Sequence, residues 1–218
     1  MLADNGRRRV ALGVQMNLFR TLWTALAACL MIGASVSPAV AAHFYVDRAL
    51  GDVAQRAAMK SPGPVQVLVE FQVNGVRNER ATKQVTKLVM VEIGKLPYLP
   101  QVSDKPVASG ALLTVKINNI FSEEERKKAM KSAFKSGFTF GASDTIVRDN
   151  YTMTFGYTSA TGAAPVTSSV RHALITTLGK GSDPTYGTEY KKAIEAISAL
   201  VGQTLDHGLD EIARKSAA

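Results

Sequence analysis

The sequence contains few of the residues that build disulfide, metal and redox centres. Its 218 residues include one Cys, one Trp and three His. A single Cys excludes an internal disulfide framework and any Cys-rich zinc or iron–sulfur site. The His residues, at positions 43, 172 and 207, are far apart in the chain. We therefore expect no bound metal or other cofactor.

Motifs that carry enzyme chemistry are also absent. The sequence has no Gly-x-Ser-x-Gly elbow, no Walker loop, no Rossmann fingerprint and no His-Glu-x-x-His pair. No nucleophile with a partnering base can be recognised, so we predict that the protein is not an enzyme.

One acidic cluster near the C-terminus could suggest a metal site or an acid–base pair. It consists of Asp206, His207, Asp210 and Glu211. A functional metal site needs converging ligands and a second shell that orients them. Because Lys and Arg residues lie nearby in the sequence, a solvated charged face explains this cluster better.

Two further polar groups have structural explanations. His172 falls on the same predicted strand face as Val170 and Leu174, which favours a histidine whose hydrogen bonds are satisfied in the core. Asp144 and Asp149 flank the start of a predicted strand, and we interpret both as turn residues.

The first forty residues have the pattern of an export signal. Arginines precede an apolar run from Thr21 to Val36, which is followed by a proline and by Ala39-Val40-Ala41. A basic start, an apolar middle and a small-x-small end are the parts of a secretory signal peptide. The run is shorter than the ~20 residues needed to cross a membrane. We predict a signal peptide at 1–41, cleaved after Ala41.

Two alternatives stay open in this region. Translation could start at Met1 or at Met16, because the residues that follow Met16 form a sufficient basic region by themselves. Leu26-Ala-Ala-Cys29 resembles the lipobox of bacterial lipoproteins, in which the Cys is acylated. Lipidation at Cys29 therefore competes with cleavage after Ala41, although an apolar filler role suits a Cys within the signal.

The chain carries a moderate excess of positive charge. The whole chain carries 26 Lys and Arg against 18 Asp and Glu, and removal of residues 1–41 leaves 22 against 17. This mild positive balance favours anionic lipid or polymer surfaces. It is too diffuse to indicate nucleic acid, which an exported protein rarely meets.

The remaining chain, 42–218, reads as a single domain. Alternating apolar residues predict strands at 65–73, 111–120, 145–158 and 165–178, the last two as a hairpin. Helical spacing predicts a short helix at 43–60, a helix at 79–96 with Asn78 as N-cap, and a long helix over 186–212. We predict an α+β fold, a two-layer sandwich in which two main helices cover one face of a mixed sheet of about four strands.

A basic amphipathic excursion at 122–141 separates two of these strands. Its basic and large apolar residues include Arg126, Lys127, Lys128, Met130, Lys131, Phe134 and Lys135. Such a segment can lie on an anionic membrane surface or dock on a partner protein. A charged helix that is simply solvated is the alternative.

The order of these elements resembles a known family. The strand at 65–71, the helix at 79–96, the strand at 111–120, the Gly-rich 137–142 and the turn at Thr161-Gly162 are similar to the periplasmic α/β module of bacterial envelope accessory lipoproteins. The resemblance covers the pattern of about Pro64 to Gly162. Lipoproteins of this family include curli-secretion, flagellar-outer-membrane and penicillin-binding-protein-activator types. It implies a non-enzymatic role in building or regulating envelope machines.

These features together predict an exported, non-enzymatic cell-envelope protein, in the periplasm or at the outer membrane, that acts by protein or membrane-surface contact. Its oligomeric state stays open. The alternative is a periplasmic small-ligand-binding protein whose pocket lies between sheet and helices. Tyrosines 151, 157, 186 and 190 could line that pocket. A hydrolase is a third hypothesis, which would need an activated nucleophile.

Overall fold

The computed structural model describes residues 42–57, 63–96, 101–108, 110–120, 124, 145–178 and 182–217, which all belong to one compact unit, Ala41–Ala218. The strands are β1 (Ala42–Val46), β2 (Val65–Val73), β3 (Val76–Arg77), β4 (Val102–Ser103), β5 (Leu112–Ile120), β6 (Thr145–Thr158), β7 (Val166–Leu178) and β8 (Thr188–Tyr190). The helices are α2 (Glu79–Gly94) and α4 (Ala193–Ala217), and a short 3-10 turn spans Pro184–Tyr186.

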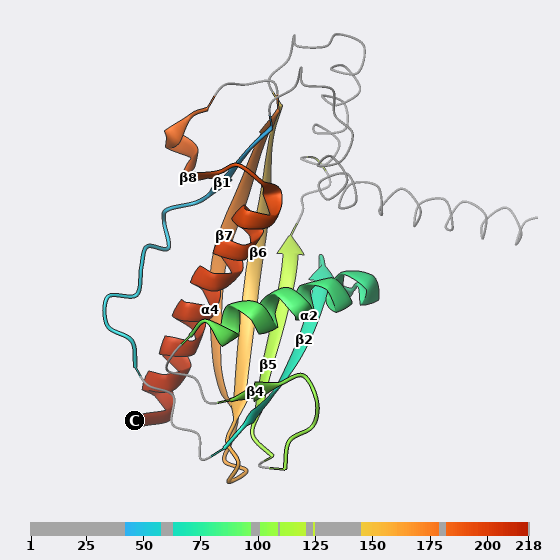
Figure 1. Cartoon of the computed structure of the whole chain (residues 1–218), viewed down its shortest axis with the longest axis vertical. Coiled ribbons are helices and arrows are strands. Elements are labelled where there is room, and N and C mark those ends of the chain that lie inside the picture. The colour runs from blue at the N-terminus through green and yellow to red at the C-terminus, as the bar shows by residue number, and fades with distance from the viewer. Residues whose placement is uncertain are drawn as a thin grey trace, which may run out of the picture. The chain divides into compact units, whose positions relative to one another are not determined.

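The strands form one mixed sheet in the order β3-β2-β5-β6-β7-β1-β8, and β4 pairs with β2. β2 and β5 are parallel because α2 crosses over between them, whereas β5, β6, β7 and β1 are antiparallel neighbours. Both helices cover one face of the sheet (Figure 1): α2 packs on β2, and α4 packs on β6, β7 and β1. The α+β class and the two helices on one face are as predicted.

The N-terminus of α2 is fixed by its cap. The side chain of Asn78 accepts a hydrogen bond from the backbone N–H of Ala81, as predicted for an N-cap. Val89 and Ile93 are buried against the sheet, one turn apart. The helix therefore lies with this apolar stripe on β2.

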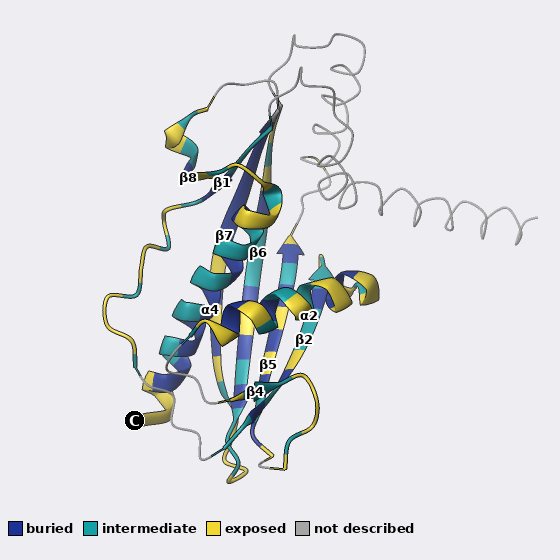
Figure 2. Cartoon of the chain, in the orientation of Figure 1, coloured by how far each residue is buried: buried dark blue, intermediate teal, exposed yellow. Residues whose placement is uncertain are grey.

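α4 packs closely on the hairpin of β6 and β7. Three side chains of α4 are fully buried in this contact, Leu205, Leu209 and Ile212. Phe155 of β6 is also fully buried. Gly208 allows the helix to approach this ring, because a Cβ atom at that position would lie 2.2 Å from Phe155 Cε2. Figure 2 shows the buried residues concentrated on the strands beneath the two helices.

The prediction of about four strands is wrong, because the sheet has eight. The four long strands occur where alternation predicts them, and the missed strands are β1, β3, β4 and β8, none longer than five residues. Strands this short carry too little alternation to be recognised, and pairing with long neighbours stabilises them instead.

The helix predicted at 43–60 is also wrong. Residues 42–46 form β1, and the described residues after it, 47–57, contain no helix. The last helix begins later than predicted, at Ala193, and Ile194 in its first turn is 51% exposed. The predicted excursion at 122–141 lies outside the described residues apart from Glu124.

Candidate functional site

The side chains predicted to make contacts lie in a part of the chain that the structure does not describe. They are Arg126, Lys127, Lys128, Met130, Lys131, Phe134 and Lys135, and Cys29 is likewise outside the described residues. The strands on either side are described. β5 ends at Ile120, which pairs with Asn150 of β6, so the segment leaves and re-enters at the same end of the sheet.

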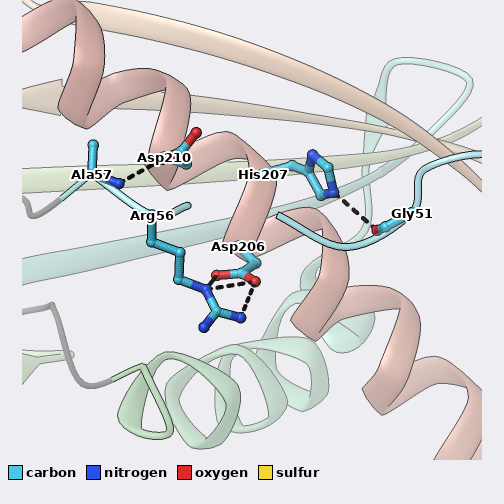
Figure 3. A network of polar contacts seen from close by, with 6 residues as sticks. All are labelled: Gly51, Arg56, Ala57, Asp206, His207 and Asp210. Carbon is cyan, nitrogen blue, oxygen red and sulfur yellow. Dashed lines mark hydrogen bonds and ion pairs between the residues drawn. The ribbon is translucent and has the colours of Figure 1, made fainter. Parts of the chain in front are cut away.

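The acidic cluster on α4 holds a neighbouring segment, which we call the strap and define as residues 47–57. The carboxylate of Asp206 accepts hydrogen bonds from both Nε and Nη2 of Arg56, the latter at 2.6 Å. Asp210 Oδ1 accepts from the backbone N–H of Ala57 at 2.7 Å. Figure 3 shows these contacts side by side along the helix.

Further contacts fasten the middle of the strap and Gln55 to α4. The Nε2 atom of His207 lies 3.1 Å from the carbonyl oxygen of Gly51 (Figure 3). Arg214 donates to the carbonyl oxygen of Gln55 and, through Nε, to Asp210 at 2.8 Å. The Arg214 guanidinium holds the pKa of Asp210 below its ordinary value. These groups therefore fasten one segment to another.

A metal site does not form from this cluster. Its side chains reach different partners rather than a common point, and Glu211 turns to Lys215 and to the hydroxyl of Ser168. Within the described ranges, no three His, Cys, Asp or Glu side chains gather in a way that could hold a metal ion.

An open groove lies beside the strap, along the edge of β7. Its volume is about 390 Å³. It is lined by Leu50, Ser169, Val170, Arg171, His207, Asp210, Glu211 and Arg214. Three segments that are distant in the sequence therefore form one surface: the strap, β7 and the C-terminal half of α4.

The tyrosines predicted to line a pocket do not converge. Tyr151 and Tyr157 both face the helices from β6, but they are six residues apart, roughly 20 Å along a strand. Tyr186 packs edge-on against Tyr45, with ring centroids 5.6 Å apart, and Tyr190 pairs with Phe44. By strand alternation, Tyr45 points away from the helices, so these rings lie on both faces of the sheet.

A buried polar group interrupts the apolar face beneath the helices. Asn119, Tyr151 and His172 are direct neighbours across β5, β6 and β7, and Asp149 lies two residues from Tyr151 on the same face. His172 Nε2 lies 2.7 Å from the side-chain oxygen of Gln203 on α4. Asn119 is completely buried, and neither polar atom of its side chain has a hydrogen-bond partner of normal geometry.

Burial sets the protonation of this group. It raises the pKa of Asp149, which is 9% exposed, to about 6, and the neighbouring Asn119 amide offsets part of the rise. Burial also lowers the pKa of His172, opposed in part by its bond to Gln203. The carboxyl thus changes charge near pH 6, and the imidazole stays neutral to lower pH than an exposed histidine does.

The prediction for His172 is confirmed, since it is a buried histidine with a hydrogen-bond partner. The interpretation of Asp149 as a turn residue is wrong, because it lies inside β6. The sequence pattern could have shown this: Asp149 is an even number of residues from the inward-facing Met153 and Phe155, so its side chain lies on the same face of the strand. The groove had no such signal, because it depends on the course of the strap.

Comparison with known proteins leaves the family open. Neither the models of known protein families nor the curated proteins match this chain. None of the helices in the described ranges is long and apolar enough to span a membrane. The resemblance to envelope accessory modules therefore stays a prediction.

Proposed function

We propose that this chain is an exported cell-envelope protein of bacteria that acts through contacts with a partner protein or a membrane surface, without catalysing a reaction. The observation that carries the proposal is the position of the first described strand. β1 starts at Ala42, the residue that would follow the predicted cleavage after Ala41. Removal of residues 1–41 would therefore keep all eight described strands.

The contact role draws on two features. The segment with Arg126, Lys131 and Phe134 combines basic and apolar side chains between two adjacent strand ends. The groove beside the strap offers backbone and charged groups at the surface. Both suit recognition of another molecule.

The export part is tested by intact mass and N-terminal peptide analysis of the protein from soluble and membrane fractions. We expect either a soluble chain beginning at Ala42 or an acylated chain beginning at Cys29. A chain that keeps residues 1–41 and stays in the cytoplasm would contradict export.

The contact part is tested by a variant in which Lys127, Lys131 and Phe134 are all changed to Ala. Binding to vesicles that contain anionic phospholipid should fall about thirtyfold, because each of the two Lys near an anionic surface is worth about 1 kcal/mol. Binding to an envelope partner should fall as well. It should also weaken with salt. The control changes the exposed Lys83 and Lys87 of α2 to Ala; unchanged binding of the triple variant would reject the assignment.

A small-ligand-binding role is the second candidate. The polar side chains of Asn119 and Asp149, buried among apolar residues, favour it, because ligand sites place a few polar groups in a mostly apolar surrounding. A thermal shift with a ligand panel separates the two functions, since only a ligand present in the assay stabilises the fold.

A further inference from the structure

β7 is longer than the strand beside it. β1 pairs with residues 174–178 of β7, so the described part of the chain places no strand beside Val166–Arg171 on that side. β6 pairs with β7 along nearly all of its length on the other side. The first half of β7, Val166–Arg171, is therefore a sheet edge with no neighbouring strand among the described residues.

The direction of the backbone groups on this edge follows from the register. Asp47 N–H donates to the carbonyl oxygen of Ala173, so odd-numbered residues of β7 turn their backbone groups away from β6. Lys215 Nζ donates to the carbonyl oxygen of Thr167 from the same side. Within the described residues, the N–H and C=O groups of Ser169 and Arg171 have no partner there.

The strap does not fill this edge. It continues from β1 but turns away at Gly51, whose φ is +66°, and it is fastened to α4 through Arg56 and His207. In Figure 1 the strap bows outward beside α4 before it returns towards the end of the helix. The groove lies between the strap and the edge, with a volume of about 390 Å³.

We propose that this groove binds one extended peptide segment of a partner protein, which adds to the sheet as a strand along residues 167–171 of β7. The site deepens the proposed contact function and rests on it for the nature of the partner. Strand addition uses main-chain hydrogen bonds for affinity, and the outward N–H and C=O groups of Ser169 and Arg171 supply them. A second copy of this chain fits less well, because the strap and the C-terminal half of α4 flank the edge.

Charge indicates one feature of the peptide. The acidic residues of the groove are already paired, Asp210 with Arg214 and Glu211 with Lys215. Arg171 is exposed and has no ion-pair partner among the described residues. We expect the peptide to carry an acidic side chain opposite Arg171, since opposite charges across neighbouring strands attract.

The test uses the protein as isolated from cells and a fluorescein-labelled peptide of about eight residues, which spans the edge at about 3.3 Å per residue. The peptide alternates Val and Thr around a central Glu. Fluorescence anisotropy should show saturable binding. A second peptide, N-methylated on alternate amides, should bind about three- to tenfold more weakly for each backbone hydrogen bond lost.

Variants of the protein locate the binding. Ser169→Pro removes an outward N–H and leaves the ladder to β6 intact, so it should weaken binding while Ser169→Thr should not. Arg171→Glu should weaken binding of the Glu peptide and strengthen binding of a Lys peptide. Circular dichroism confirms that each variant is folded.

Two results would overturn the proposal. One is the absence of saturable binding at peptide concentrations on the order of 1 mM. The other is binding that neither N-methylation nor Ser169→Pro weakens. Both results are independent of the N-terminal analysis. Failure of peptide binding would therefore not contradict export, and a retained signal peptide would not contradict peptide binding at the β7 edge.

Discussion

Asp149 is a carboxylic acid placed on the buried side of a strand. Its pKa is raised from 3.8 to about 6, so the folded protein holds a proton there that the unfolded chain has released. The contribution of Asp149 to stability is therefore greatest at low pH and falls as pH rises from about 4 to 6, by at most about 3 kcal/mol. Above pH 6 the charged, buried carboxylate is a constant penalty.

Asp149→Asn tests this linkage. The free energy of unfolding of the variant, relative to the original protein, should rise between about pH 4.5 and pH 7.5, by about 2 kcal/mol. Urea unfolding of both proteins at the two pH values measures it, and other carboxylates cancel in the difference. A difference that does not change with pH would refute the buried ionisation.

His172 acts in the opposite direction. Its lowered pKa means that the unfolded chain binds a proton more readily than the folded protein does, so its contribution is lost as pH falls below about 6.5. His172→Gln is the matched control for Asp149→Asn, because it should make the protein relatively more stable at pH 4.5 than at pH 7.5.

Gly208 and Gly202 lie on the same helix and differ in what a methyl group would meet. Gly208→Ala places Cβ within 2.3 Å of the Phe155 ring, and overpacking of this kind costs about 1–3 kcal/mol. Gly202→Ala meets only a carboxylate oxygen of Glu92, at 3.2 Å, and gains helix propensity of up to about 1 kcal/mol. Thermal unfolding should thus rank Gly202→Ala above Gly208→Ala; equal stabilities would contradict the close approach of α4 and β6.

At the scale of elements, the part of the strap from Gly51 to Ala57 is held by polar contacts with one helix, α4. Changing Asp206 and Asp210 together to Ala removes the ion pair with Arg56 and the bond to the Ala57 amide. We expect trypsin to cleave after Arg48 or Arg56 several-fold faster, because the strap opens locally. Global stability should fall by only about 1 kcal/mol for each exposed pair lost.

Glu195→Ala is the control for this experiment. Glu195 is an exposed acidic residue of α4 that pairs with Lys192 and does not contact the strap. Its loss should leave cleavage of the strap unchanged. Equal protease sensitivity of the double variant and the original protein would mean that other contacts hold the strap.

Elements long enough to repeat a pattern could be predicted from the sequence. β2 (Val65–Val73) and β6 (Thr145–Thr158) have the predicted bounds, because each alternates over several residue pairs. β8 has three residues and forms because β1 offers it an edge, which no local pattern reveals. The groove could not be predicted for the same reason, since Leu50 and Arg171 meet only through the tertiary fold.

At the scale of the whole molecule, β1 connects the predicted export signal to the fold. It lies between β7 and β8, and it contributes Tyr45 and Val46, which are 0% and 1% exposed. Burial of two such side chains stabilises a protein by about 3–6 kcal/mol. That is a large share of a typical stability of about 5–15 kcal/mol.

Stability therefore limits where the proposed signal cleavage can occur. A chain that starts at Ala42 should unfold in one cooperative transition at the temperature of the longer chain, because it keeps all eight strands of the described sheet. A chain that starts at Asp47 should lose most of its stability and expose the edges of β7 and β8. Calorimetry of the two truncated chains distinguishes them; if the shorter chain were equally stable, β1 would be dispensable and cleavage deeper in the chain would be tolerated.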